Sequence, residues 1–406
     1  MAFLSSRLLV EFMNQSEQFV FKLCRRSFLS LWSYASPRGK GGKELCDILV
    51  VCDPHVIIFS VKEVNYKETD DTVVGWERWR RSAIEESSGQ IYGAERWLGT
   101  ATSVLTKEGE VALDIPDSSV RRVHRVAVAL GASGKVPVSV GDMGKGYVHV
   151  LDELALDAVM NELDTITDFV KYLQDKEALQ ERELKIVTSG EENLFALYLH
   201  NGRCFPQSVN LLFVDDDLWT TLKLKPEYCA KKEADKESYL WDKLIEEFSN
   251  NMDKENVLFK NSAEEFECVV RVMAKEDRLC RRILSKCFKE FHQSSDTRSR
   301  MVPSPSGVLY VFLALPHGTN RQYRIAELAG RSYVARMLYP EVTQVIGIAT
   351  EQYEANKGSS LDAYYLLKEN WTPEDQTQAE NLQREFGYFV TLRQSHMSED
   401  EYPNAN

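Results

Sequence analysis

The sequence predicts an α/β protein, because runs typical of strands and runs typical of helices alternate along its 406 residues. Two apolar, β-branched runs at 48–52 and 56–61 flank an Asp-Pro-His turn signal and predict a β-hairpin. Two more apolar runs, at 308–315 and 342–350, flank a helical pattern at 320–338 and predict a β-α-β unit with parallel strands. The 43% apolar and 27% charged residues are typical of a soluble globular protein.

The hairpin lies between helical patterns. Residues 6–31 carry apolar side chains at helical spacing, which predicts one or two amphipathic helices. Residues 76–98 predict a further helix, with tryptophans on its core face. Runs at 120–130 and 147–151 predict two more strands. We therefore expect a first domain at residues 1–150.

After residue 150 the pattern is mainly helical, so we expect a helix-rich middle region at 151–300. The clearest patterns predict helices over 154–173 and 263–291, and a polar linker at 293–300. The acidic side chains of the first of these helices are expected on a solvated face, an interpretation that we favour over a metal site. They are Asp157, Glu162, Asp164 and Asp168.

A Pro-Ser-Pro-Ser-Gly stretch then marks the start of a C-terminal α/β unit at 301–393. The polar, acidic residues 394–406 are expected to form a disordered tail.

Charge and cysteine usage restrict the class of protein. The net charge of −13 repels nucleic acid at long range, whereas residues 1–46 carry seven Lys/Arg and three Glu, a local balance of +4. The eight cysteines are scattered without a Cys-x-x-Cys pair, which is typical of reduced thiols and does not favour a zinc site. No apolar run reaches about 18 residues, and Arg7 and Glu11 interrupt the N-terminal apolar stretch. We expect a cytoplasmic protein without a membrane segment.

The hairpin carries the residues that suggest chemistry. Side chains alternate along a strand, so Ser60 and Lys62 share one face of the second strand, while Asp47 stands at the start of the first. The pairing of the strands places Asp47 near Lys62 at the end of a buried hairpin. Such a pair is costly to bury unless each group is paired or holds a metal ion.

The order Glu44-x-x-Asp47, hairpin, x-x-Lys62 resembles the PD-(D/E)xK nuclease superfamily, in its Mrr-like and NERD-like branches. The resemblance covers roughly residues 1–100 and implies a restriction-endonuclease-like αβββαβ core. Asp47 matches the metal-binding aspartate of the family, and Lys62 matches the lysine that orients or activates the attacking water. Ser60 occupies the position of the family's second acid, which is a departure because serine supplies no carboxylate.

The resemblance implies a Mg²⁺ or Mn²⁺ ion, since hydrolysis of a phosphodiester needs a hard cation that neutralises charge and lowers the pKa of a water. Asp47 would bind that ion together with a carboxylate from Glu17, Glu44 or Glu63. Gln90 and Glu95, on the following helix, are weaker alternatives.

Nucleic-acid contacts are expected from two groups of basic residues, although solvated surface charge explains both equally well. One group lies in the Gly/Lys loop before the hairpin and the other on the helix after it. They are Arg38, Lys40, Lys43, Arg80 and Arg81.

These observations predict a metal-dependent nuclease that acts on DNA or RNA, in a bacterial anti-phage or restriction-like role. The alternative is a catalytically degenerate nuclease fold that serves as a protein-interaction or nucleic-acid-binding subunit. A protein partner or a homo-oligomer fits either prediction. A second carboxylate within about 4–5 Å of Asp47 would favour the enzyme, because oxygen ligands lie about 2.0–2.6 Å from such ions. A further alternative is a nucleotide-using enzyme in the C-terminal half, which only the β-α-β pattern supports.

Overall fold

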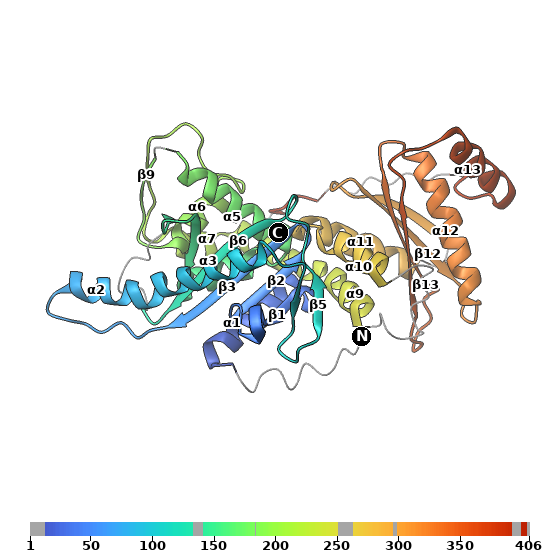
Figure 1. The fold of residues 1–406 in the computed structure, drawn as a ribbon. Helices are drawn as coiled ribbons and strands as arrows, with labels where there is room; N and C mark the ends of the chain where they lie inside the picture. The colour runs from blue at the N-terminus through green and yellow to red at the C-terminus, as the bar shows by residue number, and fades with distance from the viewer. Residues whose placement is uncertain are drawn as a thin grey trace. The chain divides into compact units, whose positions relative to one another are not determined.

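A computed structural model describes residues 13–132, 141–182, 184–250, 263–294, 299–391 and 399–403. The chain is a mixed α/β protein, as the sequence predicts, and divides into two compact units (Figure 1). Unit 1 is Met1–Cys229 and unit 2 is Ala230–Asn406. The boundaries expected after residues 150 and 300 both lie inside these units, because helices that follow residue 150 pack on the sheet of unit 1 and a strand that ends at Pro303 joins the sheet of unit 2.

A six-stranded sheet forms the centre of unit 1, in the order β1-β2-β3-β6-β8-β7. Its strands are β1 (Ser33–Ala35), β2 (Ile48–Cys52), β3 (His55–Glu63), β6 (Arg122–Leu130), β7 (Gly141–Asp142) and β8 (Tyr147–Leu151). The predicted hairpin is confirmed, with β2 antiparallel to β3 and Cys52 opposite His55. β1 is antiparallel to β2, whereas β3, β6 and β8 run parallel. Parallel neighbours need a crossover connection, which the helix after β3 provides.

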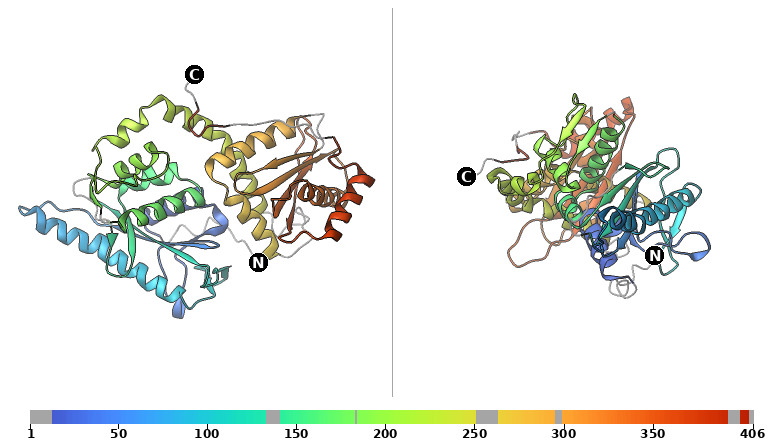
Figure 2. Two further views of the ribbon diagram at one scale, coloured as in Figure 1. Left: turned by 90° about the horizontal axis from the view of Figure 1, so that it is seen from above. Right: turned by 90° about the vertical axis from the view of Figure 1, so that its left-hand side faces the viewer.

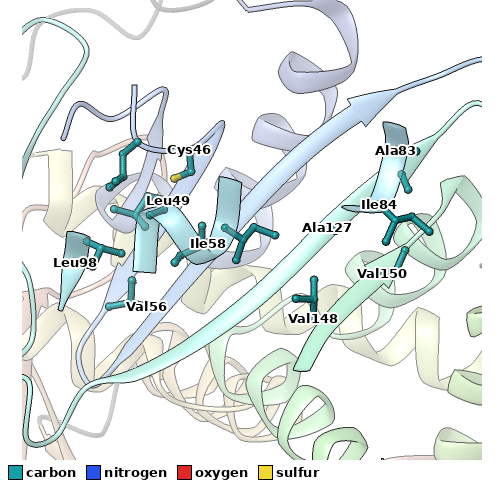
Figure 3. Close-up of a cluster of buried hydrophobic side chains, with 14 of the residues drawn as sticks. Cys46, Leu49, Val56, Ile58, Ala83, Ile84, Leu98, Ala127, Val148 and Val150 are labelled. Atoms are coloured by element: carbon teal, nitrogen blue, oxygen red, sulfur yellow. The ribbon is translucent and has the colours of Figure 1, made fainter. Parts of the chain in front are cut away.

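The helix predicted after the hairpin is confirmed and covers one face of the sheet. It consists of α2 (Thr72–Arg80), a turn of π-helix η4 (Arg81–Glu85) and α3 (Glu86–Leu98). Figure 3 shows side chains of η4 and α3, among them Ala83, Ile84 and Leu98, beside those of the strands. Val56 and Ile58 belong to this fully buried cluster, so this is the face of β3 that also carries Ser60 and Lys62.

The opposite face of the sheet packs against α1 (Gln15–Phe28), α4 (Glu153–Glu162) and α5 (Ile166–Gln180). Phe28, Phe59 and Phe169 join these layers, with ring centroids 5.0–6.4 Å apart. At the start of α1, Asn14 and Glu17 form a capping box that satisfies free backbone N–H groups.

The helix expected over 154–173 is in fact two helices, because Thr165 caps the second one and its hydroxyl accepts from the Asp168 N–H. The expected solvated acidic face is also wrong for three of its four members. Glu162, Asp164 and Asp168 are buried, and Asp168 forms an ion pair with Arg203. The Glu162 carboxylate accepts a hydrogen bond from the Tyr228 hydroxyl, so partners that lie far away in the sequence sustain the burial of Glu162 and Asp168.

The remaining elements of unit 1 surround this core. An antiparallel pair, β4 (Ser103–Leu105) and β5 (Val111–Asp114), precedes β6, and a parallel pair is formed by β9 (Lys185–Val187) and β10 (Leu211–Phe213). The short helices are η2 (Ser30–Trp32), η3 (Lys40–Gly42), α6 (Glu191–His200) and α7 (Leu218–Lys223), and α8 (Pro226–Asp235) crosses into unit 2.

Unit 2 contains a four-stranded sheet in the order β11-β12-β13-β14. Its strands are β11 (Ser299–Pro303), β12 (Val308–Leu315), β13 (Gln344–Glu351) and β14 (Leu361–Leu367), and its helices are η5 (Lys236–Ser238), α9 (Tyr239–Asn250), α10 (Ala263–Ala274), α11 (Arg278–Gln293), α12 (Arg321–Leu338) and α13 (Pro373–Phe386). The predicted β-α-β unit is confirmed, because α12 connects β12 to a parallel β13. The helices α9 and α11 pack on one face of the sheet through Trp241 and Phe288, and α12 packs on the other (Figure 2).

Three expectations for this region are corrected. The polar linker at 293–300 ends in β11, and the long helix over 263–291 is broken before Asp277, which caps α11. The disordered tail is not found at 399–403, where Glu399 pairs with Lys286 and Arg282. Residues 392–398 and 404–406 lie outside the described residues. Among the described helices, none combines the length and apolar character needed to span a membrane.

Buried ion pairs hold the sheet of unit 2 to α12. Arg324 is fully buried, and its guanidinium contacts Asp362 at 2.5 Å and Glu351 at 2.6 Å. Removing one partner of such a pair leaves an uncompensated buried charge.

We expect Arg324→Met to lower the free energy of unfolding by about 3–5 kcal/mol, because Glu351 and Asp362 would both lose the buried guanidinium, and Asp362 would be left with Arg321. The double substitution Arg324→Met with Asp362→Leu should recover only part of that loss, because Glu351 would still lack Arg324 and Arg321 would lose Asp362. Denaturant unfolding of the full chain measures both, with Arg384→Met on the exposed face of α13 as a control expected within about 0.5 kcal/mol of the wild type. Equal stability of the wild type and Arg324→Met would contradict this account.

Two buried histidines lie on the α5 side of the sheet of unit 1. The Nε2 of His149 donates to the Glu177 carboxylate at 2.9 Å, and the Nε2 of His124 lies 3.1 Å from the Nδ1 of His55. Burial lowers the pKa of His124 to about 3, with the neighbouring His55 acting in the same direction. Burial, with the positive charges of Lys176 and Arg125, lowers the pKa of His149 as well. Both side chains are therefore neutral in the folded state at neutral pH.

Below about pH 6.5 a histidine in the unfolded chain takes up a proton, whereas buried His124 and His149 do not. We therefore expect the free energy of unfolding to fall with pH below this value, by about 1.4 kcal/mol per pH unit for each histidine. In His124→Asn the dependence of the free energy of unfolding on pH should weaken by about 1.4 kcal/mol per pH unit. In the control His200→Gln, at an exposed helix end, this dependence should not change. Unfolding curves between pH 5 and pH 8 measure the slopes, and an unchanged slope in His124→Asn would overturn this assignment.

Candidate active site

Asp47 is a buried carboxylate, 5% exposed, at the entrance to β2. Its Oδ2 accepts a hydrogen bond from the backbone N–H of Val61 on β3 at 2.6 Å. Its own carbonyl accepts from the Ser36 N–H at 2.8 Å. The carboxylate is thus fixed against β3, one residue before Lys62, as the predicted hairpin register requires.

Gln90 bridges Asp47 and Ser60. The Ser60 hydroxyl donates to Gln90 Oε1 at 2.7 Å, and Gln90 Nε2 donates to Asp47 Oδ1 at 3.4 Å. Ser60 is fully buried, so its hydroxyl is shielded from solvent. Its hydrogen bond orients the amide of Gln90. The position beside Asp47 where the resemblance implies a second acid is therefore filled by a neutral amide from α3.

Two glutamates accompany Asp47. The pKa of Glu44 is raised, first by partial removal from water and then by the negative charge of Asp47. The pKa of Glu17 on α1 is raised for the same two reasons. Glu17 and Glu44 also act on each other. Sequence reasoning named both residues, and the structure brings them to the same aspartate.

Lys62 supplies positive charge at this place. It is half-buried near the end of β3, and its charge opposes the rise in the pKa of Glu17. A carboxylate of α1 therefore lies within electrostatic range of both Asp47 and Lys62. Together these residues place a lysine beside a carboxylate cluster.

The structure does not bring the other two acidic candidates to Asp47. Glu63 follows Lys62 on β3 and projects to the opposite face, where it accepts a hydrogen bond from Ser16. Glu95 is engaged by Arg125, with two contacts of 2.5–2.6 Å. Glu63 was expected as a ligand on a par with Glu17 and Glu44, and this expectation is wrong because side chains alternate along β3. The partner of Glu95 could not be inferred from the sequence.

The basic candidates fall into two groups. Arg38 and Lys43 are exposed in the loop before β2, and the side chain of Lys40 lies outside the described residues. On the helix after β3, Arg80 forms ion pairs with Glu85 at 2.7 Å and with Glu77 at 3.4 Å. Arg81 is exposed.

Sequence reasoning missed Lys107, which lies in the turn between β4 and β5. Its charge lowers the pKa of both Glu17 and Glu44, so it stands within electrostatic range of the carboxylate cluster. The strands on either side are three and four residues long and give little local signal.

The donor chemistry of the cluster fits a hard divalent cation, because Glu17, Glu44 and Asp47 supply carboxylate oxygens. The negative charge of Asp47 raises the pKa of the other two, so a cation would relieve the repulsion. Over the ranges that the structure describes, no group of three or more His, Cys, Asp or Glu side chains is arranged to hold a metal ion. Binding of such an ion would therefore need Glu17 or Glu44 to turn towards Asp47.

Comparison with known proteins adds no family to this geometry. A scan against protein-family models finds no match, and neither do searches of curated proteins and of solved structures.

A carboxylate at position 90 should make the cluster depend on a cation. We expect Gln90→Glu to lose roughly 1–3 kcal/mol of stability in EDTA, because it removes the hydrogen bond to Asp47 and adds a like charge. Mn²⁺ or Mg²⁺ should raise the melting temperature of this variant more than that of the wild type. Thermal melts with and without metal test this, with Gln378→Glu on exposed α13 as the matched control. A metal shift equal to that of the wild type would contradict the expectation.

Proposed function

We propose that this chain is a metal-dependent nuclease that hydrolyses phosphodiester bonds of DNA or RNA with Mg²⁺ or Mn²⁺. The observation that carries the proposal is the anchored carboxylate of Asp47. The Val61 N–H on β3 holds it at 2.6 Å, one residue before Lys62, and the negative charge of Asp47 raises the pKa of the nearby Glu44. A second carboxylate beside Asp47 is the feature that favours an enzyme over a scaffold.

The order of elements in unit 1 supports the proposal. α1 precedes the antiparallel strands β1, β2 and β3, and α2 and α3 then lead to β6, which runs parallel to β3. This is the succession that the resemblance to PD-(D/E)xK nucleases implies. Figure 1 shows α2 and α3 lying along β3, so that Gln90 reaches the strand that carries Ser60 and Lys62.

The residues divide the chemistry between them. Asp47, with Glu44 or Glu17, would hold a divalent cation, which neutralises charge on the phosphate and lowers the pKa of a bound water. Lys62, on the same face as Ser60, orients the attacking water and stabilises negative charge in the transition state. Ser60 and Gln90 keep the Asp47 carboxylate in its orientation through hydrogen bonds.

The biological setting follows by analogy only. A net charge of −13 with a basic N-terminal region suits an enzyme that a partner delivers to its target. We propose a bacterial anti-phage or restriction-like role on this ground.

One observation favours a second candidate function. The position of the missing acid is occupied by Ser60 and the neutral amide of Gln90, an arrangement that also suits a nuclease fold without catalysis. Such a protein would bind nucleic acid or a partner protein and would not cleave.

We expect wild-type protein with Mn²⁺ or Mg²⁺ to cleave plasmid DNA or RNA, and Asp47→Ala and Lys62→Ala to lose at least about 10²-fold in rate, the size typical of a lost transition-state contact. Glu63→Ala should cleave at nearly the wild-type rate, because Glu63 projects to the other face of β3. Gel assays with the metal and with EDTA measure the rates. Folded wild-type protein that does not cleave would favour the second candidate, and cleavage that survives both substitutions would place the chemistry elsewhere.

A further inference from the structure

The β4–β5 hairpin is hydrogen-bonded to the loop that leads to Asp47. The Arg38 N–H donates to the Leu105 carbonyl at 2.8 Å, and the Leu105 N–H donates to the Arg38 carbonyl at 3.3 Å. On its other side, Arg38 forms an antiparallel bridge with Glu44. Three backbone segments therefore lie side by side at Arg38, and they fix the hairpin relative to the carboxylate cluster.

Lys107 occupies the turn of this hairpin. The Thr106 N–H donates to the Glu110 carbonyl at 2.7 Å, and the Gly109 N–H donates back to the Thr106 carbonyl at 2.9 Å. Gly109 has a φ of 87°, a conformation that glycine adopts without strain, so the turn is tight. Lys107 is half-buried between these residues, and its charge reaches both Glu17 and Glu44.

The two groups of basic residues differ in how they are connected to the carboxylate cluster, because backbone hydrogen bonds tie the β4–β5 hairpin to the loop that leads to Asp47. Arg80, on the helical side, already has two carboxylate partners, which weaken its attraction for a phosphate. Arg38 and Lys43 project from the loop on the hairpin side and are exposed. Lys107 adds a third cation on that same side.

We propose that the phosphate backbone of the substrate follows a basic rim formed by Arg38, Lys43 and Lys107, with the β4–β5 hairpin as one wall of the binding site. This inference rests on the proposed function and deepens it, since it selects the hairpin side over the α2–η4 side for the substrate. Lysine and arginine contacts to phosphates position a nucleic acid without reading its sequence. Glu108 and Glu110 are exposed on the same turn and repel phosphates, so the backbone passes on the Lys107 side of the hairpin.

Another role for Lys107 gives a different result. A lysine that only neutralises Glu17 and Glu44 would leave nucleic-acid affinity unchanged on substitution, and its loss would increase the affinity for a divalent cation. A lysine that contacts a phosphate releases counterions on binding, so its loss changes the dependence of affinity on salt.

The test is fluorescence anisotropy of labelled duplex DNA and single-stranded RNA with the full chain, in EDTA so that no hydrolysis occurs, between about 50 and 200 mM salt. We expect Lys107→Ala to lower affinity roughly three- to tenfold and to reduce the slope of log K against log salt by about 0.9 for duplex DNA or about 0.7 for single strands. The triple alanine variant at Arg38, Lys43 and Lys107 should lose about three phosphate contacts and therefore reduce the slope by about three times as much. Lys107→Arg should retain the slope.

Two matched variants serve as controls. Glu108→Ala removes a charge from the same turn and should leave the slope unchanged or bind more tightly, and Arg80→Ala should behave as the wild type. The rim proposal would be overturned if the triple variant kept the affinity and the salt slope of the wild type. It would also be overturned if the wild type bound neither the duplex DNA nor the single-stranded RNA. Cleavage that depends on Asp47 but not on the rim would leave the proposed function intact, whereas rim-dependent binding without cleavage would sustain the rim and reject the nuclease.

Discussion

The hydrogen bond from the Val61 N–H to the Asp47 carboxylate is the interaction on which the candidate site depends. A buried carboxylate without partners would cost several kcal/mol, and Asp47 is 5% exposed. The 2.6 Å contact from the backbone of β3 and the amide of Gln90 offset that cost. Because one partner is backbone, the carboxylate keeps its place relative to β3 whatever side chains follow. Lys62 is the next residue on β3, so the same hydrogen bond also fixes its backbone relative to the Asp47 carboxylate.

A second consequence concerns the helix after β3. Gln90 reaches Asp47 only if α3 keeps its rotation over the sheet, and η4 lies directly before α3. A π-helical turn shifts the helical phase by a fraction of a turn, so the faces before and after it need not coincide. Trp79 before this turn and Ile91 after it are both buried against the sheet. The turn thus allows one long helix to bury both segments and still direct Gln90 to Ser60.

Sequence reasoning reached the hairpin and the neighbourhood of Asp47 and Lys62, because strand alternation and a turn are local properties. It named Glu17 and Glu44 without ranking them above Glu63, although alternation puts Glu63 on the other face. It could not assign Gln90, whose role depends on how α3 crosses the sheet, or Lys107, whose hairpin is held by backbone bonds to Arg38. The buried Asp168 shows the same limit, since its ion pair with Arg203 joins residues that are far apart in the sequence.

The repulsion between the carboxyl groups of the cluster connects the two candidate functions. The raised pKa of Glu44 means that a proton on this carboxyl relieves repulsion with Asp47 when no cation is bound. A divalent cation performs the same neutralisation with greater charge, so metal and proton compete for one place, and metal affinity falls as pH falls. A nuclease and a degenerate scaffold would therefore share this fold and this hydrogen-bond network. They differ in whether Glu44 and Glu17 bind a cation together with Asp47, because Gln90 supplies a neutral oxygen where a third carboxylate would have favoured the cation.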